Sequence, residues 1–398
     1  MAVSVVTGGF DPRVFESAER LVVSPGVSIR EPQIQAARER GVEVLGDIEL
    51  FAREVVAPVA AITGSNGKST VTTLLGEMAR HAGKETAVGG NIGQPVLDLL
   101  SGKNELYLLE LSSFQLETTY SLKPRVATVL NVSPDHLDRY DSLEGYTETK
   151  KAIYTGADIR VFNQDDPKVM AMLGEAQAGD LFFTLQEPDS ANVFGICLRD
   201  GERWLCRDKQ ALLPVSELQI PGQHNLANAL AALAMGTALE LPLPAMLETL
   251  CSFRGLPHRT QFIAEHAGVR WYNDSKATNV GACIAALEGV TDSVERIVLI
   301  AGGESKDADF SELVAVVEQT ARAVVLIGRD AALIEEALGG VVPVSRAVDM
   351  DAAVICASEL AKPGDCVLLS PACASFDMFK GFEHRGDCFI QAVQRLVA

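Results

Sequence analysis

The chain has 398 residues, 47% of them hydrophobic, which is too long for one ordinary core and predicts two or three domains. Its 34 basic and 53 acidic residues give a net charge of -19, and no basic run exceeds Lys150-Lys151, so we expect no nucleic-acid partner. Eight cysteines without a CxxC pair predict reduced thiols rather than zinc ligands or disulfides, and we expect a cytoplasmic protein with neither signal peptide nor membrane span.

Short runs of β-branched residues alternate with helical patterns, which is typical of parallel α/β units. Residues 1–46 predict a small leading unit with strands near "RLVVSPG" and "VEVLG". From Val59 a strand leads into a glycine loop and a helix, and further strands are predicted at Leu106–Leu111 and Val126–Val132.

Residues 193–208 predict a β-hairpin that turns at Asp200-Gly201, and helices follow from Asn225. The Gly and Pro of Phe253–His258 interrupt the helical pattern, so we place a domain boundary there. A second α/β series follows, with strands in "RIVLIAGG", "AVVLIG" and "CVLLSP". The sequence therefore predicts an α/β protein with a partial leading unit at 1–46, a central domain at 47–255 and a C-terminal domain at 256–398.

The string "AAITGSNGKSTVTTLLGEM" predicts a phosphate-binding loop. Lys68 and Ser69 fall where a strand ends and a helix begins, and the free N–H groups there favour a phosphate. Gly64 and Gly67 allow the backbone to approach it, Lys68 adds a positive charge, and Ser69 can reach a magnesium ion. The usual loop has an earlier glycine where this chain has Ile62, which indicates a shorter variant. The alternative is an ordinary strand-turn-helix connection, which the position after a buried strand disfavours.

Two side chains follow neighbouring strands of the predicted central sheet. Glu110 ends one strand, and His136 lies just beyond the next. Alone, each is more often a solvated carboxylate or a structural histidine. Because both lie beyond the carboxyl ends of strands that face the glycine loop, together they predict a magnesium site.

Lys150 is predicted to lie on an apolar helix face with Tyr146, Ile153 and Tyr154, whereas Lys151 points elsewhere. The plain alternative is a lysine whose stem lies along the apolar face while its ammonium reaches water. A desolvated lysine could instead lose its proton and react with carbon dioxide to form an anionic carbamate.

Three more polar strings follow predicted strands or open a helix. "GQHNLANALAA" places Asn225 and Asn228 three residues apart at a helix start, "WYNDSKATN" gathers polar groups from Asp274 to Asn279, and "LLSPACASFDMFKGFEHRG" follows the strand in "CVLLS". Open α/β sheets bind ligands at the carboxyl ends of their strands. The alternatives are an ordinary helix cap and ordinary loop polarity.

Taken together, the motifs resemble those of the Mur ligases from about Ser24 to the C-terminus. They occur in the family's order: "TGSNGKST", "GNIG", "LELSSFQLE", "NVSPDHLDRY", "YTETK", "GQHN", "GLPHR", "DSKATN", "GGESK" and "SPACASFDMFKGFEHRG". The last strings resemble the members that add D-glutamate. The phosphate loop of this family lacks the early glycine, which accounts for Ile62.

The resemblance implies a central P-loop-type ATPase domain, a Rossmann-like C-terminal domain for the amino acid and an N-terminal domain for a uridine nucleotide. It implies ATP-driven addition of D-glutamate to UDP-N-acetylmuramoyl-L-alanine through an acyl phosphate, in peptidoglycan precursor synthesis, by a cytoplasmic protein that we expect to be a monomer. By its role in the cell wall, such an enzyme serves cell shape, cell division and the cell cycle.

The resemblance also implies roles for individual residues. Lys68, Glu110, His136 and Lys150 would be catalytic, and Mg²⁺ would be held by Ser69, Glu110, His136 and Lys150 as a carbamate. ATP would be bound by Gly64, Asn66, Gly67, Lys68, Ser69, Thr70, Asn225, Asn228, Arg259 and Asp274. The other substrates would contact Ser24, Asn91, Ser112, His136, Lys276, Thr278, Lys306, Ser375 and Phe382.

One stretch departs from the family pattern. Only residues 1–46 precede the central domain, and "VVTGGFDP" does not resemble the family's glycine-rich turn, although Ser24–Gly26 matches it. We therefore expect weak binding of the uridine substrate and normal binding of ATP.

Three alternatives stay open from the motifs. A folylpolyglutamate-type ligase would share the ATP loop but not "DSKATN" or "SPACASFDMF", and another Mur-type ligase would add a different amino acid. A non-catalytic ATP-binding protein would have no use for Glu110 and His136.

Overall fold

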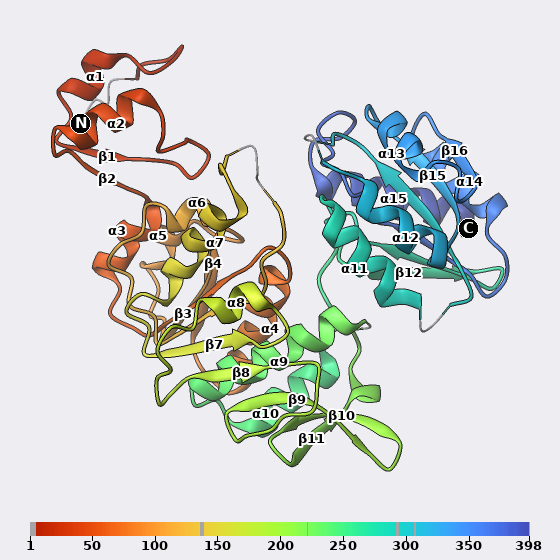
Figure 1. Cartoon of the computed structure of the whole chain (residues 1–398), viewed down its shortest axis with the longest axis horizontal. Helices are drawn as coiled ribbons and strands as arrows, with labels where there is room; N and C mark the ends of the chain where they lie inside the picture. Colours follow the sequence, from red (N-terminus) through yellow and green to blue (C-terminus); the bar gives the residue numbers. More distant parts are fainter. Residues whose placement is uncertain (1–4, 136–138, 221, 292–293, 306–307, 398) are drawn as a thin grey trace. The chain divides into compact units, whose positions relative to one another are not determined.

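The computed structural model describes residues 5–135, 139–220, 222–291, 294–305 and 308–397. The chain forms two compact units, Met1–Glu217 with Ala227–Ser252 and Leu218–Leu226 with Phe253–Ala398. Each unit contains a mainly parallel sheet with helices packed on it (Figure 1). The predicted α/β class is therefore confirmed.

Unit 1 begins with a small parallel pair of strands and its own hydrophobic cluster. The elements are α1 (Pro12–Glu16), β1 (Arg20–Val22), α2 (Pro32–Glu39) and β2 (Glu43–Leu45). Val23, Ile34 and Val44 pack together between them. Both helices open on a proline, whose missing N–H is not needed in the first turn of a helix.

The main sheet of unit 1 has the strand order β11-β10-β9-β8-β7-β6-β3-β5-β4. In chain order its strands are β3 (Val59–Thr63), β4 (Thr86–Gly90), β5 (Leu106–Glu110), β6 (Val126–Val129), β7 (Ile159–Asn163), β8 (Leu181–Phe183), β9 (Val193–Arg199), β10 (Glu202–Arg207) and β11 (Gln210–Pro214). Every neighbouring pair from β4 to β9 is parallel. Because β3 lies between β5 and β6, the carboxyl ends of these three strands share one edge of the sheet.

Helices of unit 1 pack on this sheet. They are α3 (Asp47–Glu54), α4 (Lys68–His81), α5 (Val96–Leu99), α6 (Ser113–Leu116), α7 (Leu143–Lys151), α8 (Pro167–Ala171), most of α9 (Gln223–Ala238) and α10 (Leu243–Ser252), with short 3-10 turns at Ala152–Tyr154 and Val215–Glu217. Val59 and Ala61 of β3 pack with Phe51 of α3, as alternate residues of a strand share a face. Burial of a side chain the size of phenylalanine stabilises a fold by about 1.5–3 kcal/mol.

The predicted hairpin is confirmed, because β9 and β10 pair antiparallel across Asp200-Gly201. A further strand, β11, which the sequence did not predict, extends it. Cys197 and Cys206 form a disulfide, so the expectation of reduced thiols is wrong for this pair. The antiparallel register places Cys206 opposite Gly195, two residues from Cys197, a neighbour relation that cysteine spacing alone does not reveal.

Unit 2 is built on a six-stranded sheet with the order β12-β13-β17-β14-β15-β16. Its strands are β12 (Gln261–His266), β13 (Val269–Asn273), β14 (Ile297–Gly302), β15 (Ala321–Ile327), β16 (Val344–Arg346) and β17 (Cys366–Leu369). All neighbouring pairs are parallel except β12 with β13. The strands predicted in the second α/β series are confirmed as β14, β15 and β17.

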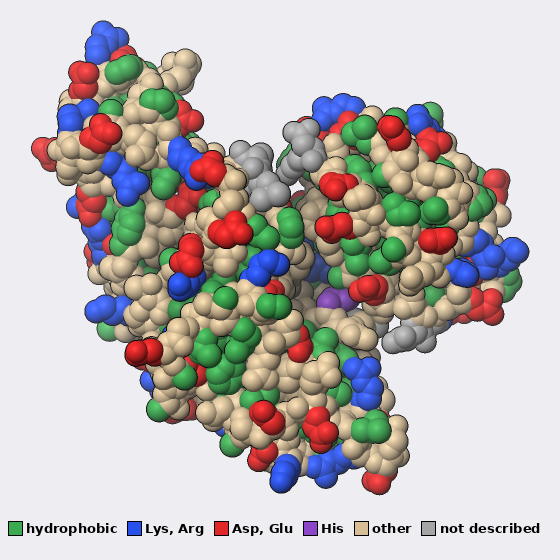
Figure 2. All heavy atoms as spheres, in the orientation of Figure 1, with side chains coloured by type: hydrophobic (Ala, Val, Ile, Leu, Met, Phe, Trp, Pro, Cys, Tyr) green, Lys and Arg blue, Asp and Glu red, His purple; other side chains and the backbone are tan. Residues whose placement is uncertain are grey.

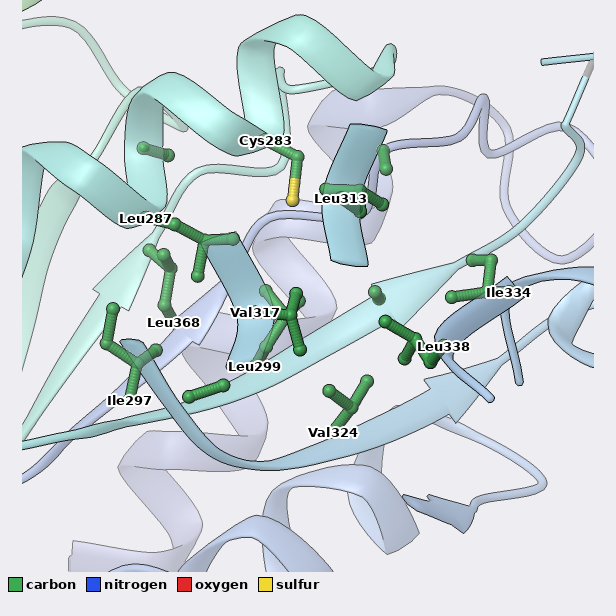
Figure 3. Packing of buried hydrophobic residues seen from close by; sticks show 14 of the residues in the cluster. Cys283, Leu287, Ile297, Leu299, Leu313, Val317, Val324, Ile334, Leu338 and Leu368 are labelled. Atoms are coloured by element: carbon green, nitrogen blue, oxygen red, sulfur yellow. The ribbon is translucent and has the colours of Figure 1, made fainter. Parts of the chain in front are cut away.

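One face of this sheet is covered by α11 (Val280–Val290), α12 (Ser311–Thr320) and α13 (Ala331–Leu338). Leu299 of β14 and Val324 of β15 pack there with Leu287, Val317 and Leu338 from the three helices (Figure 3). These residues belong to a hydrophobic core that fills the space between the sheet and the three helices.

The opposite face is covered by α14 (Met350–Leu360) and α15 (Phe382–Val397). Val298 and Val325, each next in sequence to a residue of the first core, pack there with Phe389 of α15. A parallel strand that is buried on both faces therefore accounts for the continuous apolar runs in the sequence.

On the face shown in Figure 2, acidic and basic side chains are scattered over both units. Within the described part of the chain, no helix combines the length and the apolar character needed to cross a membrane.

Candidate active site

The segment between β3 and α4 has the backbone geometry of a close-fitting loop. Gly64 and Gly67 have φ of 152° and 82°, a region that residues with a side chain rarely adopt. A Cβ on Gly67 would lie 2.4 Å from Oδ1 of Asn228, so this position has no room for a side chain. Ser69 and Thr70 lie buried in the first turn of α4, where backbone N–H groups have no helical partner and can bind an anion.

The loop is fastened to the segment that follows β6. Asn131 accepts a hydrogen bond from the N–H of Asn66 (2.8 Å) and donates one to the carbonyl of Asn66 (3.1 Å). Ser65 Oγ donates to the carbonyl of Ser133 and accepts from its N–H, both at 3.0 Å, and lies 3.3 Å from the hydroxyl of Tyr146. These bonds set the shape of the loop in advance of any ligand. Sequence reasoning assigned no role to Asn131, although it stands in the string "NVSPDH".

Lys68 begins α4 and folds back over the loop. Its ammonium donates to the carbonyls of Gly64 (2.7 Å) and Ser65 (2.8 Å). A lysine in this position adds a positive charge next to the loop N–H groups, which suits the phosphates of a nucleotide.

Lys150 reaches the same loop from α7 and is 1% exposed. Its Nζ donates to the carbonyl of Gly64 (3.0 Å), lies 3.5 Å from Thr63 Oγ1 and stands 4.5 Å above the ring of Tyr146. Burial lowers the pKa of Lys150 well below its ordinary value, and the nearby charge of Lys68 lowers it further. The side chain of Lys151 is 43% exposed and pairs with Glu148, so the predicted contrast between the two lysines is confirmed.

Glu110 ends β5 beside β3 and is 2% exposed. Its Oε1 accepts a hydrogen bond from Asn91 Nδ2 at 2.8 Å, whereas its Oε2 is buried and has no hydrogen-bond partner among the described residues. An orphaned buried carboxylate oxygen needs explanation, and a missing ligand is one of the ordinary ones. Ser112 follows two residues later as the N-cap of α6, in a capping box with Gln115.

Asn225 and Asn228 both lie buried near the start of α9. Asn228 belongs to unit 1 and stands beside Gly67, as the close approach of its Oδ1 shows. Asn225 belongs to unit 2.

The turn that contains Ser24 is held against the central part of unit 1 by Arg139. The guanidinium of Arg139 donates to the carbonyls of Pro25 (2.9 Å) and Val27 (3.2 Å) and pairs with Glu117 at 2.7 Å. It also lies 4.0 Å from the ring centroid of Phe114, which follows Ser112 on α6. Sequence reasoning assigned no role to Arg139, although it lies in the string "NVSPDHLDRY".

In unit 2, Asp274 follows β13 and is buried. Its carboxylate accepts hydrogen bonds from the N–H of Thr260 (2.9 Å) and the hydroxyl of Ser370 (2.9 Å). Burial raises the pKa of Asp274 to about 7, although these hydrogen bonds and the charge of Arg259 oppose the rise.

Four of the residues predicted to contact the amino acid also lie in unit 2. The ammonium of Lys276 stands 3.9 Å from the centroid of the Phe382 ring, a cation–π contact that fixes its direction. Thr278 lies two residues further on, where its N–H donates to the carbonyl of Lys276 at 2.8 Å. Ser375 is buried in the loop after β17.

Two predicted site residues, His136 and Lys306, lie outside the described residues. Within the described ranges, no three His, Cys, Asp or Glu side chains form a cluster able to hold a metal. Lys68, Glu110 and Lys150 lie near one another in unit 1, because the charge of Lys68 lowers the pKa of Lys150 and the charge of Glu110 raises it.

Family models match most of the chain. A Mur ligase middle domain matches residues 62–236, a Mur ligase glutamate ligase domain matches 258–373, and a Mur ligase MurD-like N-terminal domain matches 1–46. The last match includes the stretch that departs from the family pattern.

Curated relatives match the chain over nearly its full length. The UDP-N-acetylmuramoylalanine–D-glutamate ligase of Nitrosococcus oceani is 55% identical over 98% of this chain and 86% of its own. The ligase of the same name from Pseudomonas aeruginosa is 53% identical over 99% of this chain and 88% of its own.

Solved structures share the fold at low sequence identity. A pseudomurein peptide ligase type C from Methanothermus fervidus superposes with a TM-score of 0.69 at 16% identity, covering 98% of this chain and 89% of its own. A UDP-N-acetylmuramate-alanine ligase from Thermotoga maritima gives 0.64 at 20% identity, covering 95% and 86%.

Proposed function

The chain belongs to the Mur ligase family, and from this premise we propose that it joins D-glutamate to UDP-N-acetylmuramoyl-L-alanine with ATP as the energy source. The observation that carries the proposal is the 55% identity to a ligase of that name over 98% of the chain. The product would be a peptidoglycan precursor, so the enzyme would act in cell-wall synthesis. We also propose that it is a cytoplasmic monomer.

The reaction forms one amide bond in two steps. An oxygen of the substrate carboxylate attacks the γ-phosphorus of ATP, so that ADP leaves and an acyl phosphate forms. The amine of D-glutamate then attacks the acyl carbon, loses a proton, and the tetrahedral intermediate expels inorganic phosphate. Both steps need negative charge to be neutralised along the phosphoryl path.

The phosphate loop supplies that neutralisation in the proposed mechanism. The N–H groups of Gly67 to Thr70 would hold the phosphates, since the N–H of Asn66 already donates to Asn131, and Lys68 would move from the loop carbonyls to the β- and γ-phosphates. Asn228 beside Gly67, together with Asn225, Arg259 and Asp274, would bind the remainder of ATP. Support comes from the loop geometry, which hydrogen bonds within the protein already fix.

Magnesium fits the residues present. Glu110 has a buried carboxylate oxygen without a partner among the described residues, and Ser69 lies in the first turn of α4 at the same edge of the sheet. Carboxylate, hydroxyl and carbamate oxygens are the ligands that this hard cation prefers. We propose Ser69, Glu110, His136 and Lys150 as a carbamate for the metal site; when bound, the ion would offset the charge of the transferred phosphoryl group.

The substrates would be distributed between the two units. Ser24, Asn91, Ser112 and His136 would contact the muramoyl substrate, and Lys276, Thr278, Lys306, Ser375 and Phe382 would hold D-glutamate. A dianionic amino acid calls for cations such as Lys276 and Lys306. We propose three functional regions with the predicted boundaries 1–46, 47–255 and 256–398.

An ADP-release assay tests the proposal. The purified chain is incubated with ATP, Mg²⁺, UDP-N-acetylmuramoyl-L-alanine and one amino acid at a time, and D-glutamate is expected to give the highest kcat/KM. Preference for another amino acid would assign it to a different Mur ligase reaction. ADP release with a folate substrate, or with no acceptor at all, would reject the proposal.

A further inference from the structure

Arg385 is one of the largest fully buried side chains in the protein, with an exposed fraction of 0%. It lies in the first turns of α15, where burial lowers its pKa while the charges of Asp377 and Asp274 oppose that shift. A buried charge is costly, and it persists where dense hydrogen bonding compensates for the lost water.

The guanidinium of Arg385 directs its donors to two separate loops. Nε donates to Ser275 Oγ (3.0 Å) and Nη2 to the carbonyl of Ser275 (2.8 Å). Nη1 donates to the carbonyls of Cys373 (3.0 Å) and Ala374 (3.3 Å). One planar group therefore links the loop after β13 to the loop after β17, and these strands are parallel neighbours.

Each linked loop contains a residue proposed to hold D-glutamate. Ser275 precedes Lys276, and Ala374 precedes Ser375. The hydroxyl of Ser275 also donates to the carbonyl of Phe382 at 2.8 Å, and the ammonium of Lys276 stands over the ring of that residue. The contacts form a continuous path from Arg385 through Ser275 and Phe382 to Lys276.

The next residue, Gly386, allows α15 to pack closely against the end of β13. A Cβ there would lie 2.2 Å from Nδ1 of His258 and 3.0 Å from Nδ2 of Asn273. The carbonyl of Gly386 accepts a hydrogen bond from that Nδ2 at 3.3 Å. Because glycine lets the helix backbone approach the end of β13, the guanidinium of Arg385 reaches both loops directly.

We propose that Arg385 is a positioning residue for the amino acid substrate: it sets the distance between the loop that carries Lys276 and the loop that carries Ser375. The inference rests on the proposed function, and Arg385 itself touches no substrate. Its planar fork of five donors can serve both loops at once, whereas the single ammonium of a lysine cannot. A shift of one loop by about 1 Å at a binding site can lower activity by up to about two orders of magnitude.

The test compares Arg385→Lys with Arg395→Lys in the full-length chain. Arg395 lies on the same helix, is 60% exposed and pairs with Asp351 at the surface, so it serves as a matched control. For Arg385→Lys we expect KM for D-glutamate to rise about tenfold or more, while KM for ATP and for the uridine substrate stay within about twofold. Arg395→Lys should leave all three unchanged.

A second variant keeps the test decisive if Arg385→Lys does not fold. Ser275→Ala removes only the hydroxyl that joins Arg385 to the Phe382 carbonyl, and we expect a smaller rise in KM for D-glutamate alone. Where both variants fold, the double variant should show less than the sum of the single effects, because both act on one link.

The two proposals fail in different ways. A wild-type chain that does not use D-glutamate would reject the proposed function. A wild-type chain that uses D-glutamate, with an unchanged KM for it in Arg385→Lys or, if that variant does not fold, in Ser275→Ala, would overturn the positioning role. Equal rises in KM for all three substrates would also overturn it, because they would indicate a general structural defect.

Discussion

The ammonium nitrogen of Lys150 lies 3.0 Å from the carbonyl oxygen of Gly64, so a buried lysine of α7 contacts a glycine of the phosphate loop 86 positions earlier in the chain. Burial lowers the pKa of Lys150 well below its ordinary value, which favours the neutral amine. A neutral amine can attack carbon dioxide and release a proton, and the product is an anionic carbamate.

Lys150→Ala should therefore abolish most ligase activity, whereas Lys151→Ala should retain nearly all of it. Lys151 is the matched control because it is the next residue and its ammonium pairs with Glu148 in solvent. A short carboxylic acid should partly restore Lys150→Ala, since it returns oxygens to the vacated space, but not Lys150→Arg, which keeps the bulk. Initial rates of ADP release measure this. Full activity of Lys150→Ala, or greater damage from Lys151→Ala, would contradict the carbamate.

Asn131→Ala should weaken ATP binding. The variant loses both hydrogen bonds to the backbone of Asn66, which lets the phosphate loop leave its ligand-ready shape. We expect KM for ATP to rise about tenfold with KM for D-glutamate unchanged. Asn104→Ala is the control, because Asn104 bonds the carbonyl of Leu99 in a surface turn. An unchanged KM for ATP in a folded Asn131→Ala would mean that the loop keeps its shape without this residue.

Arg139→Lys should weaken binding of the uridine substrate. Lysine keeps the charge but cannot bond the carbonyls of Pro25 and Val27 and the carboxylate of Glu117 in the same geometry. We expect KM for the uridine substrate to rise about tenfold and KM for ATP to stay constant. The exposed Arg30, which pairs with Asp141, gives the control Arg30→Lys. Isothermal titration with the uridine substrate checks the affinity directly; equal affinities for wild type and Arg139→Lys would refute the role.

Asp274→Asn should stabilise the fold at high pH while it removes activity. The pKa of Asp274 rises from 3.8 to about 7 on folding, so the folded chain binds more protons than the unfolded chain between these values, and stability falls as the pH rises through them. Asparagine cannot ionise, so the variant avoids the loss of folding free energy, about 4 kcal/mol, that ionisation of the buried Asp274 causes at high pH. Urea unfolding should show the gain at pH about 8 and its loss toward pH about 4.

The exposed Asp189 supplies the control for this pH dependence, as Asp189→Asn. That variant should show no such change between the two pH values. A gain for Asp274→Asn that is the same at both pH values, or absent at the higher one, would show that burial of the charge does not cost stability.

The sequence was sufficient for the features that depend on local pattern. The alternation of apolar strands and helices predicts both sheets, and helical phase alone distinguishes the buried Lys150 from the half-buried Lys151. The strand-end position of Glu110 predicts its place at the phosphate-loop edge of the sheet, because parallel strands end together.

Local sequence pattern does not predict contacts between segments that are distant in the chain. The role of Asn131 depends on which strand lies beside β3, and that of Arg385 depends on the close approach of α15 to two loops. The cysteine pair was missed for the same reason, since it depends on the register of a hairpin. Strand order, register and close approach are properties of the folded chain and leave little local trace in the sequence.

The most direct test of the account follows one oxygen atom. UDP-N-acetylmuramoyl-L-alanine labelled with ¹⁸O in its carboxylate is turned over with ATP, Mg²⁺ and either D-glutamate or L-glutamate, and the released phosphate is analysed by mass spectrometry. The acyl-phosphate route predicts that each phosphate carries one substrate oxygen and that its release depends on D-glutamate. Phosphate without the label, or equal release with L-glutamate, would contradict the proposed reaction.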